Sequence, residues 1–116
     1  MENPNPVRDK SYAFALRIVG FCEKLNERKA YVLSKQLLRS GTSIGANIEE
    51  ALQGQSRKDF ISKLSIALKE AFESKYWLRL IRDAKIITND EILPLLQDID
   101  EVMKLLTSII KTSKTV

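Results

Sequence analysis

Apolar residues recur along this chain at alternating intervals of four and three residues. The pattern is clearest near the C-terminus, at Ile92, Leu96, Ile99, Met103, Leu106 and Ile110. A segment near the N-terminus repeats it with Phe14, Ile18, Phe21 and Leu25, and residues 60–81 follow the same rule. This spacing gathers apolar side chains on one face of an α-helix, and no segment alternates with the period of a strand. The pattern predicts four helices, at about residues 6–26, 30–53, 57–84 and 89–112.

The ends of these segments carry residues that start and stop helices. Three candidate N-caps precede a segment: Asn5, Ser56 and Thr88. Asp59 and Glu91 follow the last two by three residues, as in a capping box, and Gly54 is expected to close the second helix in a left-handed conformation. Short connections favour antiparallel neighbours. The chain is therefore predicted to be one all-α domain, residues 1–116, folded as an antiparallel up-down-up-down four-helix bundle.

The stretch "QLLRSGTSIGANIEEA" (36–51) places two glycines inside the second predicted helix. Gly41 falls on the apolar seam and Gly45 beside it, although each costs a helix roughly 1 kcal/mol relative to alanine. That cost is expected where a neighbour packs unusually close. The expected neighbours are bulky residues: Phe14, Phe21, Phe60, Phe72 or Trp77. A turn at 40–42 is the alternative, whereas a phosphate-binding loop is excluded because no Lys-Ser or Lys-Thr pair follows the glycines.

A stripe of mostly short polar side chains runs beside this seam. It consists of Gln36, Ser40, Ser43, Asn47 and Glu50, bordered by Arg39. Three interpretations remain open: hydrogen bonds to a neighbouring helix, an interface between subunits to which Trp77 would contribute, and a ligand or nucleic-acid site.

The positive charge of the chain is modest in size but uneven in placement. The formal charge is +4, from 19 Lys+Arg and 15 Asp+Glu, and the excess lies in residues 57–85. The candidate nucleic-acid-binding residues are Lys75, Arg79 and Arg82, with Lys69 and Lys85 nearby. The first three are spaced to share one helix face, where they can follow a phosphate backbone while an aromatic neighbour stacks on an unpaired base. The alternative is a solvated helix face.

Enzymatic chemistry has little to build on in this sequence. There is no histidine, and the single cysteine, Cys22, falls on the apolar face of the first predicted helix. We therefore expect no catalytic residues, no metal site and no cofactor. No apolar run approaches the roughly 20 residues of a membrane helix, and the N-terminus lacks a signal core, so a cytoplasmic location without membrane contact is expected.

Residues 36–51, followed by "DFISKLSIALKEAFESKYWLRLI" (59–81), resemble the four-helix-bundle proteins encoded in intervening sequences of bacterial 23S ribosomal RNA genes. The matching positions are Gln36, Arg39, Ser40, Ser43, Ile44, Asn47, Ile48 and Glu50, then Leu64, Ala67, Glu70, Ser74 and Leu78. Ala51 departs from the pattern, since many members carry glycine there. The resemblance implies a bundle that often assembles as a homopentamer. It also implies relatives among the accessory variability proteins of diversity-generating retroelements, which bind nucleic acid and a reverse transcriptase.

These observations lead to one functional hypothesis and one alternative. The hypothesis is a non-enzymatic oligomeric module that binds RNA or DNA through its basic face, as an accessory to a larger nucleic-acid enzyme. The alternative is a protein-interaction scaffold with no nucleic-acid role.

Overall fold

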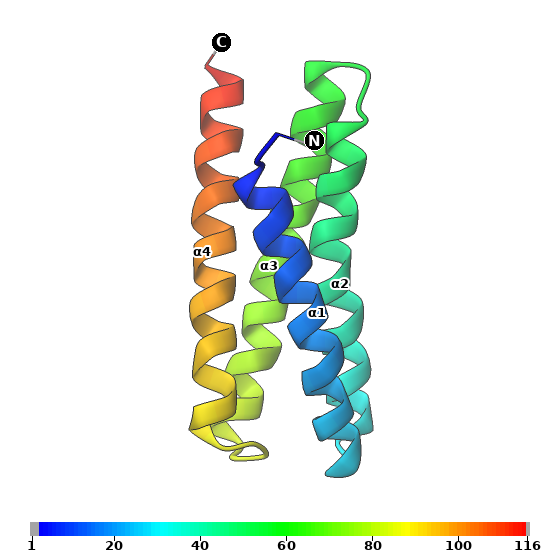
Figure 1. Cartoon of the computed structure of the whole chain (residues 1–116), viewed down its shortest axis with the longest axis vertical. Coiled ribbons are helices and arrows are strands. Elements are labelled where there is room, and N and C mark those ends of the chain that lie inside the picture. Colours follow the sequence, from blue (N-terminus) through cyan, green and yellow to red (C-terminus); the bar gives the residue numbers. More distant parts are fainter. Residues whose placement is uncertain (1–2, 116) are drawn as a thin grey trace.

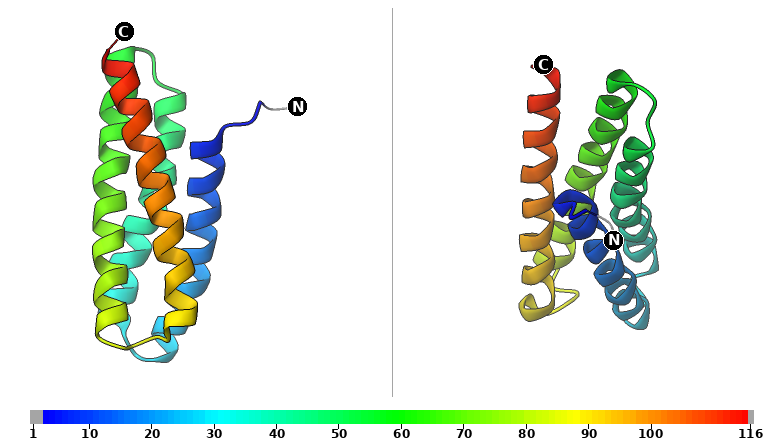
Figure 2. Two further views of the ribbon diagram at one scale, coloured as in Figure 1. Left: turned by 90° about the vertical axis from the view of Figure 1, so that its left-hand side faces the viewer. Right: turned by 45° about the horizontal axis from the view of Figure 1, so that its top comes forward.

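The computed structural model describes residues 3–115 and shows four long helices side by side (Figure 1). They are α1 (Pro6–Glu27), α2 (Tyr31–Leu52), α3 (Arg57–Asp83) and α4 (Asn89–Lys114). Each helix runs opposite to the one before it, and α4 returns to lie against α1, as the rotated views show (Figure 2). The predicted antiparallel up-down-up-down bundle is confirmed, and every helix end lies within two residues of its predicted position.

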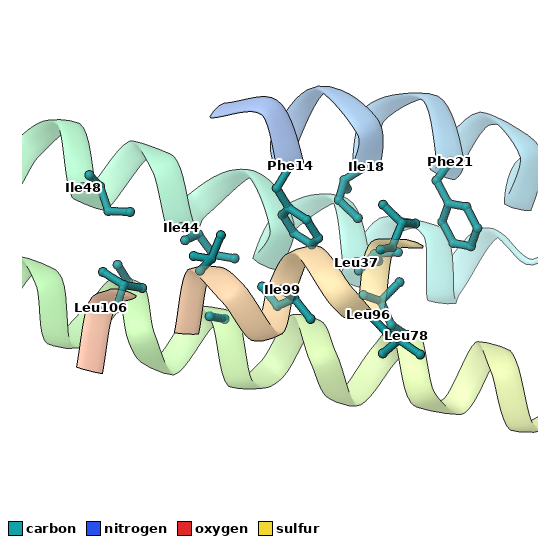
Figure 3. Close-up of a cluster of buried hydrophobic side chains, with 14 of the residues drawn as sticks. Phe14, Ile18, Phe21, Leu37, Ile44, Ile48, Leu78, Leu96, Ile99 and Leu106 are labelled. Carbon is teal, nitrogen blue, oxygen red and sulfur yellow. The ribbon is translucent and has the colours of Figure 1, made fainter. Parts of the chain in front are cut away.

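The core is formed by the apolar rows that the four-three spacing predicted. Figure 3 shows Phe14 and Ile18 of α1 pointing inward, together with Ile44 of α2, Leu78 of α3 and Ile99 of α4. All five are at most 1% exposed. Burying such a side chain contributes about 1.5–3 kcal/mol, so the packing of these rows, rather than helix propensity alone, holds the helices together.

The continuity of α2 through its Ser-Gly dipeptide excludes the alternative of a turn, and the reason for Gly41 is a close contact. A Cβ at Gly41 would lie 3.0 Å from Cγ2 of Ile18, which is fully buried. At Gly45 a Cβ would meet the Ser11 hydroxyl at 3.5 Å, an ordinary contact distance. The expectation of an aromatic neighbour was wrong. A branched aliphatic side chain of α1 fills the space, while Phe72 lies 57% exposed on α3.

The N-terminal caps agree with the sequence at two of three helices. The side chains of Asn5 and Ser56 each accept a hydrogen bond from the backbone N–H three residues later, at 3.1 and 3.0 Å. The capping box expected at Thr88 was wrong, because the Thr88 side chain caps no backbone N–H. The Glu91 carboxylate receives its main hydrogen bond from Lys24 Nζ of α1, at 2.6 Å, and the interaction with Thr88 that remains is a smaller one.

The residues that end helices in a left-handed conformation are not those that the sequence predicted. No described glycine has a positive φ, so the expectation of a left-handed Gly54 was wrong. A Cβ at Gly54 would lie only 2.9 Å from the Ala51 carbonyl oxygen, so this position has no room for a larger residue. The left-handed residues are Lys29 after α1 (φ 61°) and Lys85 after α3 (φ 58°). In both turns the following residue donates its N–H to the carbonyl five residues earlier, as in a Schellman motif.

Three ion pairs join α1 to α4. They are Lys10–Glu101 at 2.6 Å, Arg17–Asp98 at 2.5 Å and Lys24–Glu91 at 2.6 Å. The three cations are spaced by seven residues and so form one stripe along α1. The hydrogen bond from Lys24 lowers the pKa of Glu91, and the positive charge of the same residue adds to the shift. Because the pairs are exposed, their main effect is to select the face of α4 that turns toward α1.

The glycines of α1 and α2 provide a test of the close contact at Gly41. Gly20→Ala should stabilise the protein by about 0.5–1 kcal/mol, because a Cβ there meets nothing within 4 Å and alanine favours the helix. Gly41→Ala should lose that gain, because overpacking against Ile18 costs about 1–3 kcal/mol. Urea unfolding measures both. Equal stabilisation by the two substitutions would show that Ile18 moves aside freely.

The lysine in the left-handed turn after α1 provides a second test. Lys29→Gly should raise the free energy of unfolding by about 1 kcal/mol, because a side chain is unfavourable at this φ. The same replacement within a helix, Lys35→Gly, should lower it by about 1 kcal/mol. Denaturant titrations that give the two variants the same sign would contradict a left-handed Lys29.

The Lys24–Glu91 pair predicts a dependence of stability on pH. A lowered folded-state pKa means that the stabilisation is present above the ordinary value of 4.5 and is lost as the pH falls through the folded value. Glu91→Gln should therefore destabilise the protein at about pH 7 and have a smaller effect at about pH 3. Glu23→Gln, a change of another α1 or α4 carboxylate outside these pairs, is the control. A Glu91→Gln effect of equal size at both pH values would contradict the ion pair.

Candidate nucleic-acid interface

A groove about 680 Å³ in volume runs between α3 and α4 on the outside of the bundle. We call it the α3–α4 groove; its lining residues are Lys75, Asp100, Met103, Lys104, Thr107, Ser108 and Lys111. Lysines outnumber carboxylates three to one in this lining. The hydroxyls of two α4 residues add hydrogen-bonding groups, so the groove suits an anionic ligand better than a cationic or apolar one.

The basic character of the groove follows from the way α4 is rotated. Three of its carboxylates face α1, where they pair with the cation stripe described above. The opposite flank of α4 therefore presents Lys104 and Lys111, both exposed, and neither is in an ion pair with any residue of the described range 3–115. Asp100 is the acidic residue of the groove, and it pairs with Lys75 Nζ at 2.7 Å.

The predicted row on α3 extends the groove toward one end of the bundle. Lys75, Arg79 and Arg82 share a face of α3 by their spacing. Arg79 is exposed, and Arg82 pairs with Asp83 at 2.8 Å. The hydrogen bond from Arg82 lowers the pKa of Asp83, so this carboxylate is ionised at neutral pH and offsets part of the positive charge.

The row ends at a second pocket, about 640 Å³ in volume, between the two end loops. Arg28, Arg82 and Lys85 line it, together with Asp83 and residues 86–89. Nη1 of Arg28 donates a hydrogen bond to the Ile86 carbonyl at 2.8 Å, which holds this guanidinium across the α3–α4 loop. The pocket thus brings a cation of the first loop to two cations predicted from the sequence.

Lys69 lies apart from this arrangement. It is six residues before Lys75, which places it about 120° away around α3, outside the groove. It is exposed on the outer face of the helix, where Phe72 and Tyr76 are 57% and 50% exposed. Of the five predicted nucleic-acid-binding residues, the structure therefore brings four into one connected surface and leaves Lys69 on the neighbouring face.

Two members of the polar stripe of α2, together with the bordering Arg39, contact α3 of the same chain. Ser40 is fully buried, and Ser74 Oγ donates a hydrogen bond to its hydroxyl at 2.9 Å. Arg39 pairs with Glu70 at 3.3 Å and with Glu73, and Glu50 pairs with Lys63 at 3.3 Å. These contacts are the hydrogen bonds to a neighbouring helix that the sequence left open as one interpretation.

The other members of the stripe make local contacts. Ser43 Oγ donates to the Ser40 carbonyl at 3.0 Å, and Asn47 Nδ2 donates to the Ser43 carbonyl at 2.9 Å. Trp77 Nε1 donates to Glu73 at 3.0 Å. Gln36 is partly exposed beside them. A role of these residues between subunits remains a prediction.

Other chemistry is sparse in the described part of the chain. Cys22 is buried, as expected from its position on the apolar face, and burial raises the pKa of its thiol. Among residues 3–115 no group of three or more His, Cys, Asp or Glu side chains is placed to hold a metal ion. Within the same range, no helix combines the length and apolar character needed to cross a bilayer.

Sequence reasoning missed the contribution of α4 to the groove. Lys104 and Lys111 are spaced by seven residues, the same signal that was read on α3 as a shared face. Residues 86–116 contain more acidic than basic residues, which hid the signal. Helical spacing places Lys104 and Lys111 about 120–140° around α4 from Asp98, and the packing of α1 then pairs the acidic flank and leaves the lysines exposed.

A family model and a similar crystal structure support the fold described above. The family model of the 23S rRNA-intervening sequence protein matches residues 4–108. A crystal structure of a protein of unknown function from the S23 ribosomal protein family of Bacteroides thetaiotaomicron is 57% identical, with a TM-score of 0.88 over 90% of this chain and 98% of that one. No curated protein matches. The chain belongs to the 23S rRNA-intervening sequence protein family.

Proposed function

We propose that this protein is a non-enzymatic, oligomeric module that binds RNA or DNA through the α3–α4 groove and the adjoining cation row of α3. The observation that carries the proposal is the separation of charge on α4, whose carboxylates pair with α1 while Lys104 and Lys111 face the groove. We place it in the cytoplasm, as an accessory to a larger nucleic-acid enzyme, in keeping with the family resemblance.

The shape of the cationic surface suits an extended polyanion. Lys75 lies opposite Asp100, so the path from Arg82 on α3 to Lys111 on α4 covers seven residues of one helix and eleven of the other. At 1.5 Å per residue this path is about 27 Å long. A strand of nucleic acid places several phosphates over that distance, and each lysine or arginine that neutralises one releases a condensed counterion.

Self-association would multiply this surface. A run of exposed apolar residues lies on α1 and α2, made up of Tyr12, Leu16, Val19 and Leu38. An exposed apolar cluster is typical of a protein interface, and we propose that copies of the chain meet through it. The resemblance to the family implies a homopentamer, in which the cation row would be repeated five times around a ring and a modest charge per subunit would become a strong one.

Removing one groove lysine should weaken binding measurably. Lys104→Ala should lower the affinity for a labelled RNA hairpin with single-stranded tails about five- to eightfold near 0.1 M salt, because each phosphate contact contributes about 0.7–0.9 to the salt slope. The slope of log K against log salt should become less steep by about 0.7–0.9. Fluorescence anisotropy over a range of salt concentrations measures both quantities.

Lys35→Ala is the matched control, since Lys35 is an exposed lysine on α2 and its loss changes the net charge equally. It should leave the affinity almost unchanged. Equal weakening by the two substitutions would mean that net charge alone, and not the groove, attracts RNA. A wild-type protein that self-associates but shows no salt-dependent RNA binding would favour the alternative, a protein-interaction scaffold built on the exposed apolar residues.

A further inference from the structure

We infer that the nucleic acid bound by this surface is single-stranded, with its phosphates along the cation row and its bases stacked on Phe72 and Tyr76. This inference rests on the proposed function and adds the class of nucleic acid to it. It is drawn from the aromatic side chains beside the groove, which the charge argument alone does not explain.

Both aromatic rings are exposed, and the Tyr76 ring is supported by a neighbouring ring. Phe72 is 57% and Tyr76 50% exposed. The Tyr76 ring meets the Trp77 ring edge-on, with centroids 5.2 Å apart and planes at 68°. Trp77 is in turn fixed by its hydrogen bond to Glu73 at 3.0 Å. Tyr76 is therefore held by its neighbour, which reduces the entropy lost when a base stacks on it.

The rings lie next to the cations on the same helix. Phe72 and Arg79 are seven residues apart, so they differ by only about 20° around α3, and Tyr76 lies about 40° from Phe72 on the side away from Arg79. Lys75 follows Phe72 by three residues and belongs to the groove. A strand with its phosphates on this row would present its bases to the two rings. A cationic track flanked by aromatic side chains is the usual arrangement in proteins that bind single strands.

The spacing of the rings favours an unpaired strand over a duplex. Phe72 and Tyr76 are four residues apart, which separates their attachment points by about 6 Å along the helix. Successive bases of a duplex strand are only 3.4 Å apart and are covered by their own stacking. An unstacked single strand can stretch to the wider spacing. If a duplex were bound, the same rings would contact sugar and phosphate instead of base faces, and this contact would bury little apolar surface.

An exposed surface with aromatic side chains, such as that formed by Phe72 and Tyr76, can also be covered by a second copy of the chain. The charges around the rings argue against a symmetric pairing of this face with itself. Lys69, Lys75 and Arg79 lie on the same side of α3 as the rings, and the same cations of a second copy would repel them. A polyanion satisfies the charges and the rings together, so single-stranded nucleic acid is the occupant that the surface fits.

The test compares a labelled oligouridine of about 15 nucleotides, roughly the upper site size of a single-strand-binding domain, with a blunt RNA duplex of the same length. The variants are Phe72→Ala, Tyr76→Ala and Phe72→Trp, with Tyr31→Ala, an exposed tyrosine of α2, as the control. Each alanine substitution at the rings should weaken oligouridine binding at least about fivefold, because stacking contributes about 1 kcal/mol or more per base. Phe72→Trp and Tyr31→Ala should retain wild-type affinity, and wild type should bind the duplex more weakly than oligouridine.

Three results would overturn the inference. The first is wild-type binding of the duplex as tightly as oligouridine, with Lys104→Ala still weakening it; the proposed function would then stand and the stacking would not. The second is unchanged oligouridine affinity of both alanine variants. The third is loss of self-association in those variants, measured by light scattering, which would assign the rings to a contact between copies. Failure of the proposed function is distinct, since wild type would then bind neither RNA in a salt-dependent way.

Discussion

The ion-pair stripe between α1 and α4 decides which charges of this bundle remain available to a partner. Lys10, Arg17 and Lys24 take up three carboxylates of α4 and so remove negative charge from the flank that borders α3. Each exposed pair stabilises the fold only modestly. Their consequence for the surface is larger, because a helix with more acidic than basic residues presents mainly lysines on its other side. The sequence of α4 thus separates its acidic and basic faces, and the packing of the bundle decides that the acidic face is paired and the basic face is exposed.

The position of the α1–α4 ion-pair stripe depends on how α1 packs against α2. Ile18 occupies the space left by Gly41, and a Cβ there would push the two helices apart. The same seating places Ser11 against Gly45 and allows the buried Ser34 hydroxyl to donate to the Cys22 carbonyl at 3.1 Å. With the rotation of α1 fixed by these contacts, its cations can only face α4. Gly41 is therefore linked to the charge of the α3–α4 groove through the α1–α2 and α1–α4 interfaces.

The sequence predicted the fold well because helical periodicity and cap residues are local signals. The buried rows, the ends of all four helices and the caps at Asn5 and Ser56 could all be read directly. The failures involve contacts between distant segments and the residues of two turns. Glu91 is spaced as a capping residue, yet Lys24 of another helix binds it. Lysines replace glycine in both left-handed turns, which propensity does not anticipate. The row on α3 was readable from spacing, whereas Lys104 joins it only because α4 is rotated by its neighbours.

The most direct test of this charge separation is to map the contact surface of bound nucleic acid by amide chemical-shift changes in the labelled protein. Titration with oligouridine should shift the resonances of α3 and α4 that border the groove, including Lys75, Lys104 and Lys111. The amides of the α1 cation stripe should remain unchanged. Shifts concentrated on α1, or spread evenly over all four helices, would contradict the assignment of the binding surface to the face of α4 that is turned away from α1.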